Sequence, residues 1–224
     1  MSPGPRIALI HALRDSMVPI WNEFEQSWPE AKTFNLLDDS LSEDLADEGA
    51  LTQAIVDRFL NLGRYARAAG PDGQKTDAIL FTCSAFGPAI DQVKQDLDVP
   101  VLSPNEAAFE VALKADGPVG LLVTFPPSEA SLSAELRRAA AAQKHDLVLK
   151  TGVAVGALAA LQAGREEEHD ALIAGAAREL GDVSCIVLGQ FSMARAYRSV
   201  EQATQRRVIT TPAAAVSRLR QILN

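Results

Sequence analysis

The stretch Asp77-Ala-Ile-Leu-Phe-Thr-Cys-Ser-Ala-Phe-Gly-Pro88 contains an apolar run short enough for a buried strand, and small and turn-forming residues follow it. The run stops at Cys83, which places a thiol at the carboxyl end of the expected strand. A helix that begins at once, near Ser84 or Ala85, directs free backbone N–H groups at whatever lies in front of it. We expect these donors and the helix dipole to bind a carboxylate and to lower the pKa of the thiol. The alternative is that Cys83 is a small buried apolar residue.

A second segment, Cys185-Ile-Val-Leu-Gly-Gln-Phe-Ser-Met-Ala194, has the same layout. Superposing the two apolar runs places Gln190, and not Cys185, opposite Cys83. Cys185 falls at the start of its strand, so we interpret it as a core residue. The turn at residues 190–192 would supply a second set of N–H donors.

Two further pairs of segments repeat in the same order along the chain. Arg6-Ile-Ala-Leu-Ile-His-Ala12 matches Pro118-Val-Gly-Leu-Leu-Val-Thr124, and Val101-Leu-Ser-Pro104 matches Ile209-Thr-Thr-Pro212. The spacing between partners is nearly constant, which favours two similar halves over the weak self-similarity of any alternating strand and helix protein. We place the halves at residues 1–116 and 117–224, and allow for the C-terminal helix to cross over.

The expected strands are continuous apolar runs separated by long helical patterns. Strands of this kind are covered on both faces, which is typical of an α/β fold with parallel sheets and crossover helices. Ligands of such sheets bind beyond the carboxyl ends of the strands, so both turns are expected to face one cleft. Strands are predicted at residues 7–11, 78–82, 99–102, 119–123, 148–150, 186–189 and 208–210, and the acidic stretch 38–48 is predicted to precede one long helix over 49–69.

Composition narrows the class of protein and its partners. The chain has 224 residues, 47% of them hydrophobic and 22% charged, which is ordinary for a soluble globular protein. The net charge of −8 opposes a nucleic-acid partner. No apolar run approaches the roughly 18 residues of a membrane span. The first residues lead directly into a strand without a signal segment, so we expect a cytoplasmic protein with reduced thiols.

Other polar residues lie at the same expected strand ends. His11 ends the first strand, where it could polarise the thiol, bind a substrate or be structural. Thr124 and Ser128 occupy the equivalent turn of the second half, where they could fix a carboxylate or cap a helix that starts near Glu129. The histidines show no metal-ligand spacing, and the chain has no Gly-rich phosphate loop and no paired CxxC. We therefore expect neither a metal nor a cofactor.

The sequence resembles the aspartate/glutamate racemase superfamily, which includes hydantoin and allantoin racemases, maleate isomerase and arylmalonate decarboxylase. The resemblance rests on the opening strand to His11, on residues 81–87, on Pro104-Asn-Glu106, on residues 120–124 and on residues 186–189 with the turn that follows. It implies two flavodoxin-like three-layer halves, related by a pseudo-twofold axis across a cleft, with no cofactor and a small carboxylate substrate. A homo-oligomer is left open.

The resemblance also implies roles for the residues at the two strand ends. Two-base racemases of this superfamily have one cysteine after each of two homologous strands; Cys83 matches the first position, and Gln190 stands at the second. An amide cannot accept and return a proton near neutral pH, so Gln190 becomes a hydrogen-bond donor. The catalytic residue is then Cys83, and the candidate substrate-binding residues are His11, Ser84, Ala85, Thr124, Ser128, Gln190, Phe191 and Ser192.

Three functions follow as hypotheses. The first is a cofactor-independent isomerase or racemase that acts at the carbon alpha to a carboxylate, with a single thiol. The second is a single-cysteine decarboxylase or a thiol hydrolase, in which His11 would be the general base of the hydrolase. The third is a carboxylate-binding protein without catalysis.

Overall fold

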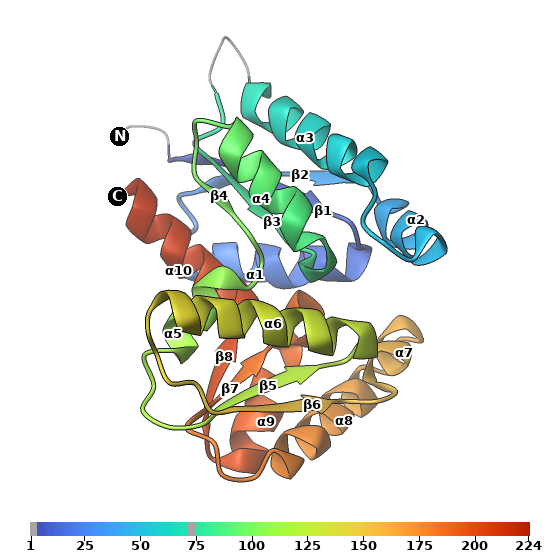
Figure 1. The fold of residues 1–224 in the computed structure, drawn as a ribbon, viewed down its shortest axis with the longest axis vertical. Coiled ribbons are helices and arrows are strands. Elements are labelled where there is room, and N and C mark those ends of the chain that lie inside the picture. Colours follow the sequence, from blue (N-terminus) through green and yellow to red (C-terminus); the bar gives the residue numbers. More distant parts are fainter. Residues whose placement is uncertain (1–3, 71–74) are drawn as a thin grey trace. The chain divides into compact units, whose positions relative to one another are not determined.

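The structure is a computed structural model that describes residues 4–70 and 75–224, and it contains two compact units (Figure 1). Unit 1 is formed by the chain up to Pro104 together with Ala215–Asn224, and unit 2 is formed by Asn105–Ala214. From the sequence we expected a boundary between residues 116 and 117 and allowed for the C-terminal helix to cross over. The compact units divide instead after Pro104 and again after Ala214, so unit 1 is built from two separate pieces of the chain.

Unit 1 contains a four-stranded parallel sheet with the order β2-β1-β3-β4. Its central strand β1 pairs with β3 from Ile7 opposite Ala78 to Ile10 opposite Phe81. Helices α3 and α4 cover one face of this sheet and α1 covers the other, while α2 lies near the end of α3 (Figure 1). The elements are β1 (Arg6–His11), α1 (Met17–Ser27), β2 (Lys32–Leu37), α2 (Leu41–Glu48), α3 (Gln53–Ala68), β3 (Ala78–Phe81), α4 (Gly87–Asp96) and β4 (Val101–Leu102).

Successive residues of a strand point to opposite faces of the sheet. Almost every residue of the central strands β1 and β3 is buried, so both faces of the sheet are covered there. Ala8 and Ile10 of β1 belong to the cluster that includes α3 and α4. Within this cluster Phe59 of α3 packs on Phe81 and Phe86, with ring centroids 5.3 and 4.8 Å apart. This aromatic contact fixes the end of β3 and the turn that follows it.

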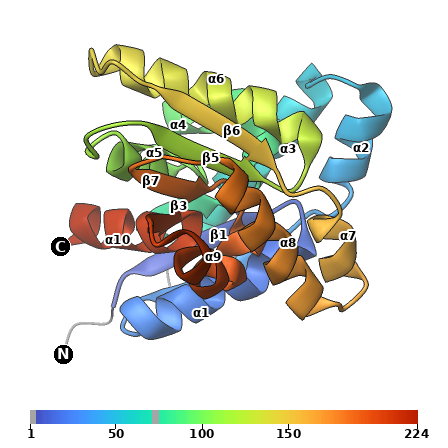
Figure 2. The same ribbon diagram turned by 90° about the horizontal axis from the view of Figure 1, so that it is seen from below.

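Unit 2 repeats the arrangement with the strand order β6-β5-β7-β8, again all parallel. Helices α5 and α6 pack on one face of its sheet, and α7, α8 and α9 pack on the other (Figure 2). The elements are α5 (Glu106–Ala112), β5 (Val119–Val123), α6 (Pro126–Ala142), β6 (Leu149–Val153), α7 (Ala157–Gln162), α8 (Glu166–Glu179), β7 (Cys185–Leu188), α9 (Tyr197–Thr204) and β8 (Arg207–Thr210). Helix α10 (Thr211–Leu223) begins in unit 2 and continues into unit 1 from Ala215.

The identical strand order of the two sheets confirms the predicted α/β fold with two parallel sheets. It is the order of the first four strands of a flavodoxin-like sheet. Two elements were missed. Strand β2 is an edge strand with exposed polar positions, so it has no continuous apolar run. Helix α2 was assigned to the lead-in of one long helix, but Gly49 in the left-handed region, with φ of 66°, ends α2 before α3 begins.

No helix among the described residues is long and apolar enough to cross a membrane.

Candidate active site

Cys83 lies just beyond the carboxyl end of β3. The chain stays extended through Thr82, whose N–H donates to the carbonyl of Ile10 at 3.0 Å, and through Cys83, with φ of −115° and ψ of 122°. A single 3₁₀ turn follows at Ser84–Phe86, and α4 begins at Gly87. Buried Phe86 anchors this turn in the core. The predicted strand end is therefore present, but one 3₁₀ turn separates the thiol from the α-helix.

The surroundings of Cys83 raise the pKa of its thiol. Burial is the largest cause, and a hydrogen bond from the Ala85 N–H and one from the Ser42 hydroxyl oppose it by favouring the thiolate. The predicted lowering of this pKa is wrong in its net direction, because the half-buried sulfur packs against the apolar core of unit 1. The predicted N–H donor is nevertheless in place at Ala85.

Ser42, in the first turn of α2, is a site residue that the sequence analysis missed. Its hydroxyl donates to the carbonyl of Ala12 at 2.8 Å and also lies within hydrogen-bonding reach of Cys83. A hydroxyl carries one proton, so Ser42 donates either to the Ala12 carbonyl or to a thiolate at Cys83. Only the acidic character of residues 38–48 was visible in the sequence, and it gave no signal for this serine.

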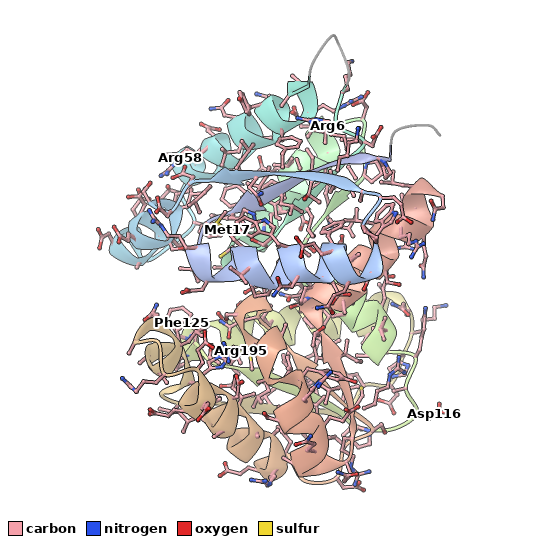
Figure 3. The ribbon with its side chains drawn as sticks, turned by 180° about the vertical axis from the view of Figure 1, so that it is seen from behind. Arg6, Met17, Arg58, Asp116, Phe125 and Arg195 are labelled. Atoms are coloured by element: carbon pink, nitrogen blue, oxygen red, sulfur yellow. The ribbon has the colours of Figure 1, made fainter. Side chains whose placement is uncertain are left out.

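Arg58 of α3 holds the segment that carries Ser42, and Figure 3 labels it beside α2. Its guanidinium donates to Asp38 and to the Ser40 hydroxyl, each at 2.6 Å, and it also pairs with Asp44. Leu41, at the first position of α2, is fully buried. Buried Leu41 and the guanidinium of Arg58 therefore fix the position of the Ser42 hydroxyl.

His11 is fully buried at the end of β1, and both of its ring nitrogens have partners. Nε2 lies 2.9 Å from Asn35 Oδ1, and Nδ1 lies 2.8 Å from Thr82 Oγ1 and 3.3 Å from Ser16 Oγ. Asn35 Oδ1 also accepts from the indole N–H of Trp21 at 2.7 Å. Because an indole nitrogen can only donate, this contact fixes the amide oxygen of Asn35 as an acceptor and makes His11 Nε2 a donor.

The same contacts determine the state of the His11 ring. Burial lowers its pKa, and the hydrogen bond to Asn35 opposes that shift. In the neutral ring Nδ1 is then an acceptor, and Thr82 is the nearest hydroxyl that can donate to it. With both nitrogens engaged, His11 supports the structural alternative and has no nitrogen left to take a proton from a thiol.

Gln190 is the unit 2 counterpart of Cys83 in backbone position. It follows β7 by two residues, as Cys83 follows β3, and it too is extended, with φ of −134° and ψ of 144°, before a 3₁₀ turn at Phe191–Ala196. Its Oε1 accepts from the N–H of Thr124 at 2.7 Å and from the Thr124 hydroxyl at 2.8 Å. The backbone N–H can only donate, so these bonds fix the amide orientation and leave Nε2 as the group free to donate.

The other predicted residues of unit 2 lie close to this pair in the chain and are largely buried. Phe191 and Ser192 belong to the 3₁₀ turn and are 2% and 7% exposed. Ser128 is also buried, inside the first turn of α6, whose N-cap position is held by Phe125 without a side-chain bond. The helix-capping alternative for Thr124 and Ser128 is therefore wrong, because α6 begins at Pro126 and not near Glu129.

The turn after Gln190 is anchored to α8 by charged side chains. Arg195 of this turn, labelled in Figure 3, donates to Asp170 at 2.9 Å and pairs with Glu166 at 2.8 Å. Asp170 also lies 2.7 Å from Nδ1 of the fully buried His169. These contacts stabilise the backbone on which Gln190 sits.

The predicted core role of Cys185 agrees with its place as the first residue of β7, where it is fully buried. Among the described residues, no three His, Cys, Asp or Glu side chains gather in a way that could hold a metal ion. Unit 1 thus brings Cys83 together with Ala85 and Ser42, and unit 2 brings Gln190 together with Thr124.

Comparison with solved structures shows the same fold in several racemases. A glutamate racemase from Bacillus anthracis superposes with a TM-score of 0.74 at 13% identity, covering 99% of this chain and 82% of that one. An allantoin racemase from Klebsiella pneumoniae gives 0.70 at 16% identity, covering 98% and 87%. An aspartate racemase homologue from Pyrococcus horikoshii OT3 gives 0.66 at 14% identity, covering 97% and 98%.

Sequence comparison extends this result beyond the fold. No curated protein matches the sequence. The family model described as Asp/Glu/Hydantoin racemase, however, matches residues 24–219, which include both strand-end turns. The resemblance inferred from the sequence is thus confirmed over most of the chain, and the protein belongs to the Asp/Glu/Hydantoin racemase family.

Proposed function

We propose that the protein is a cofactor-independent isomerase that acts at the carbon alpha to a carboxylate of a small acid, with Cys83 as its single catalytic thiol. The observation that supports this most directly is the position of that thiol. It lies at the carboxyl end of a parallel strand, with the Ala85 N–H and the Ser42 hydroxyl in reach. The Ala85 N–H, joined by the Ser42 hydroxyl when it turns from the Ala12 carbonyl, would stabilise the charged form of the sulfur more than its neutral form.

The first step of the proposed reaction is removal of the alpha proton by the Cys83 thiolate. The electron pair of the broken C–H bond moves toward the carboxylate carbon and gives an enediolate. In the proposal a water molecule then delivers a proton to the opposite face of the carbon, and the hydroxide that remains is neutralised by the proton that the Cys83 thiol releases, which restores the thiolate. A thiolate of raised pKa is a stronger base than an ordinary one, and less of it is present at neutral pH. The Ser42 hydroxyl would increase the thiolate fraction by turning from the Ala12 carbonyl to the sulfur.

Gln190 acts in this proposal as a hydrogen-bond donor and not as a second base. The two bonds from Thr124 occupy its oxygen, so Nε2 is the group that can reach a carbonyl or carboxylate oxygen of the substrate. The N–H groups of the two strand-end turns, at Ser84, Ala85, Phe191 and Ser192, are the proposed donors to developing negative charge, with the hydroxyls of Ser84 and Ser192. The Thr124 hydroxyl donates to Gln190 instead and holds its side chain in place.

The geometry of His11 disfavours the hydrolase hypothesis. A hydrolase would need His11 to take the proton of Cys83, and both ring nitrogens are bound by Asn35 and by Thr82 with Ser16. Isomerisation with the thiol itself as the base requires no such partner.

Proton exchange in heavy water tests the proposal. The protein is incubated with amino acids, hydantoins, malonates and unsaturated diacids, and loss of the alpha C–H signal is followed by proton NMR. We expect exchange on at least one carboxylate, its loss in Cys83→Ala, and its retention in Cys185→Ala. Exchange that persists in Cys83→Ala would contradict the assignment of the thiol, and release of carbon dioxide from a malonate would assign decarboxylation in its place.

A further inference from the structure

A pocket of about 330 Å³ lies in unit 1 between α1 and the edge strand β2. Small-molecule sites begin at roughly this volume. Residues 21, 24, 25 and 28 follow the spacing of one helix face, so they line the pocket together from α1, which starts at Met17 (Figure 3). From β2 come Thr33 and Asn35, which alternate along the strand and so share a face.

Three aromatic rings form the helix side of this pocket. Trp28 is only 3% exposed and stacks on Phe24 with ring centroids 6.2 Å apart. Trp21 is 37% exposed, and the bond from its indole N–H to Asn35 holds the ring by its edge. Trp21 is thus the ring with exposed surface, and the face of an aromatic ring carries negative electrostatic potential that attracts a cation.

Glu25 is the one charged residue among the side chains that line the pocket. It stands between the aromatic residues on the same helix face and is exposed, so its carboxylate lies at the open side of the pocket. Aromatic faces and a carboxylate attract the same kind of group, a positively charged one, and the net charge of −8 adds to this attraction.

We propose that this pocket binds a small organic ammonium ion. The rings favour an alkylated cation over a hydrated metal ion, and Glu25 favours a cation over a neutral molecule of the same shape. At the strand side, the Thr33 hydroxyl oxygen can accept a hydrogen bond from a ligand N–H. The ligand differs in charge from the carboxylate of the proposed reaction, so this site is separate from Cys83 in its chemistry.

Intrinsic fluorescence tests this proposal directly because both tryptophans of the chain line the pocket. The protein is titrated with tetramethylammonium chloride at constant ionic strength, with sodium chloride and the neutral tert-butanol as controls. We expect a saturable change with tetramethylammonium alone. An absent or non-saturable change, or an equal change with tert-butanol, would overturn the proposal.

Two variants separate the role of Glu25 from general charge. Glu25→Gln is expected to weaken binding roughly threefold to fivefold, as for an exposed ion pair or cation contact. Glu30→Gln removes an exposed carboxylate from the next segment of the chain and is expected to leave binding unchanged. Equal affinities of Glu25→Gln and the unmodified protein would refute the role of the carboxylate.

A second measurement locates the ligand. Asn35 lines the pocket and also bonds the His11 ring, so the NMR signals of that ring are expected to shift with the same midpoint as the fluorescence. A fluorescence midpoint that His11 does not share would place the ligand outside the pocket and overturn the proposal.

Discussion

Replacing Gln190 by Met removes the acceptor for Thr124 while keeping the length of the side chain. Thr124 is 4% exposed, so its N–H cannot simply turn to water once Gln190 Oε1 is gone. An unsatisfied buried donor costs about 1–3 kcal/mol. The Thr124 hydroxyl can rotate to another acceptor. Loss of its bond to Gln190, at 2.8 Å, therefore adds only the net contribution of one hydrogen bond to stability, about 0.5–1.5 kcal/mol.

The expected loss is therefore about 3 kcal/mol in the opening free energy of the turn, a factor of roughly 150 in its equilibrium constant. Hydrogen exchange measures this at the Thr124 amide itself, which avoids assuming that the two units unfold together. Gln190→Glu keeps a side-chain oxygen that can accept both bonds from Thr124 and is the matched control. Equal protection of the Thr124 amide in the Met and Glu variants would refute the assignment of the bond.

Three further perturbations have defined outcomes. The rate at which iodoacetamide alkylates Cys83 can be followed by mass spectrometry across a pH series. Because burial raises the pKa of this thiol, we expect the midpoint of the rate profile above about 8.5, the value of an unperturbed thiol. A lower midpoint would contradict the raised pKa. Ser42→Ala is expected to move the midpoint further up by removing a donor to the thiolate, whereas Ser27→Ala, which removes an exposed hydroxyl at the end of α1, is expected to leave it in place. The pKa of His11 is lowered in the fold, so the unfolded chain binds the proton first, and the free energy of unfolding falls as the pH drops below about 6.5. Urea titrations at several pH values should show a smaller decrease for His11→Gln. The same dependence on pH in both proteins would contradict the lowered pKa.

The fold was largely readable from the sequence because both sheets are built from continuous apolar runs. β1, β3, β5, β7 and β8 each lie within one or two residues of the predicted strand. β2 escaped because an edge strand needs only one buried face, and Asn35 interrupts its pattern. The sequence therefore revealed strands where burial is complete and lost them where it is partial.

The strand-end residues were also readable, but their surroundings were not. Cys83 and Gln190 stand at equivalent backbone positions, as their apolar runs predicted. The sign of the Cys83 pKa shift depends on how deeply the sulfur is packed, and Ser42 reaches it only through the folding of a separate helix. Contacts between segments far apart in the chain cannot be derived from a local pattern.

The discontinuous make-up of unit 1 has a consequence for how the protein is made. Ala215–Asn224 follow the whole of unit 2 in the chain, yet they belong to the unit whose other piece precedes unit 2. Arg220 in this piece donates to the carbonyl of Ser27 at the end of α1. Unit 1 can therefore reach its final stability only after all of unit 2 has been synthesised.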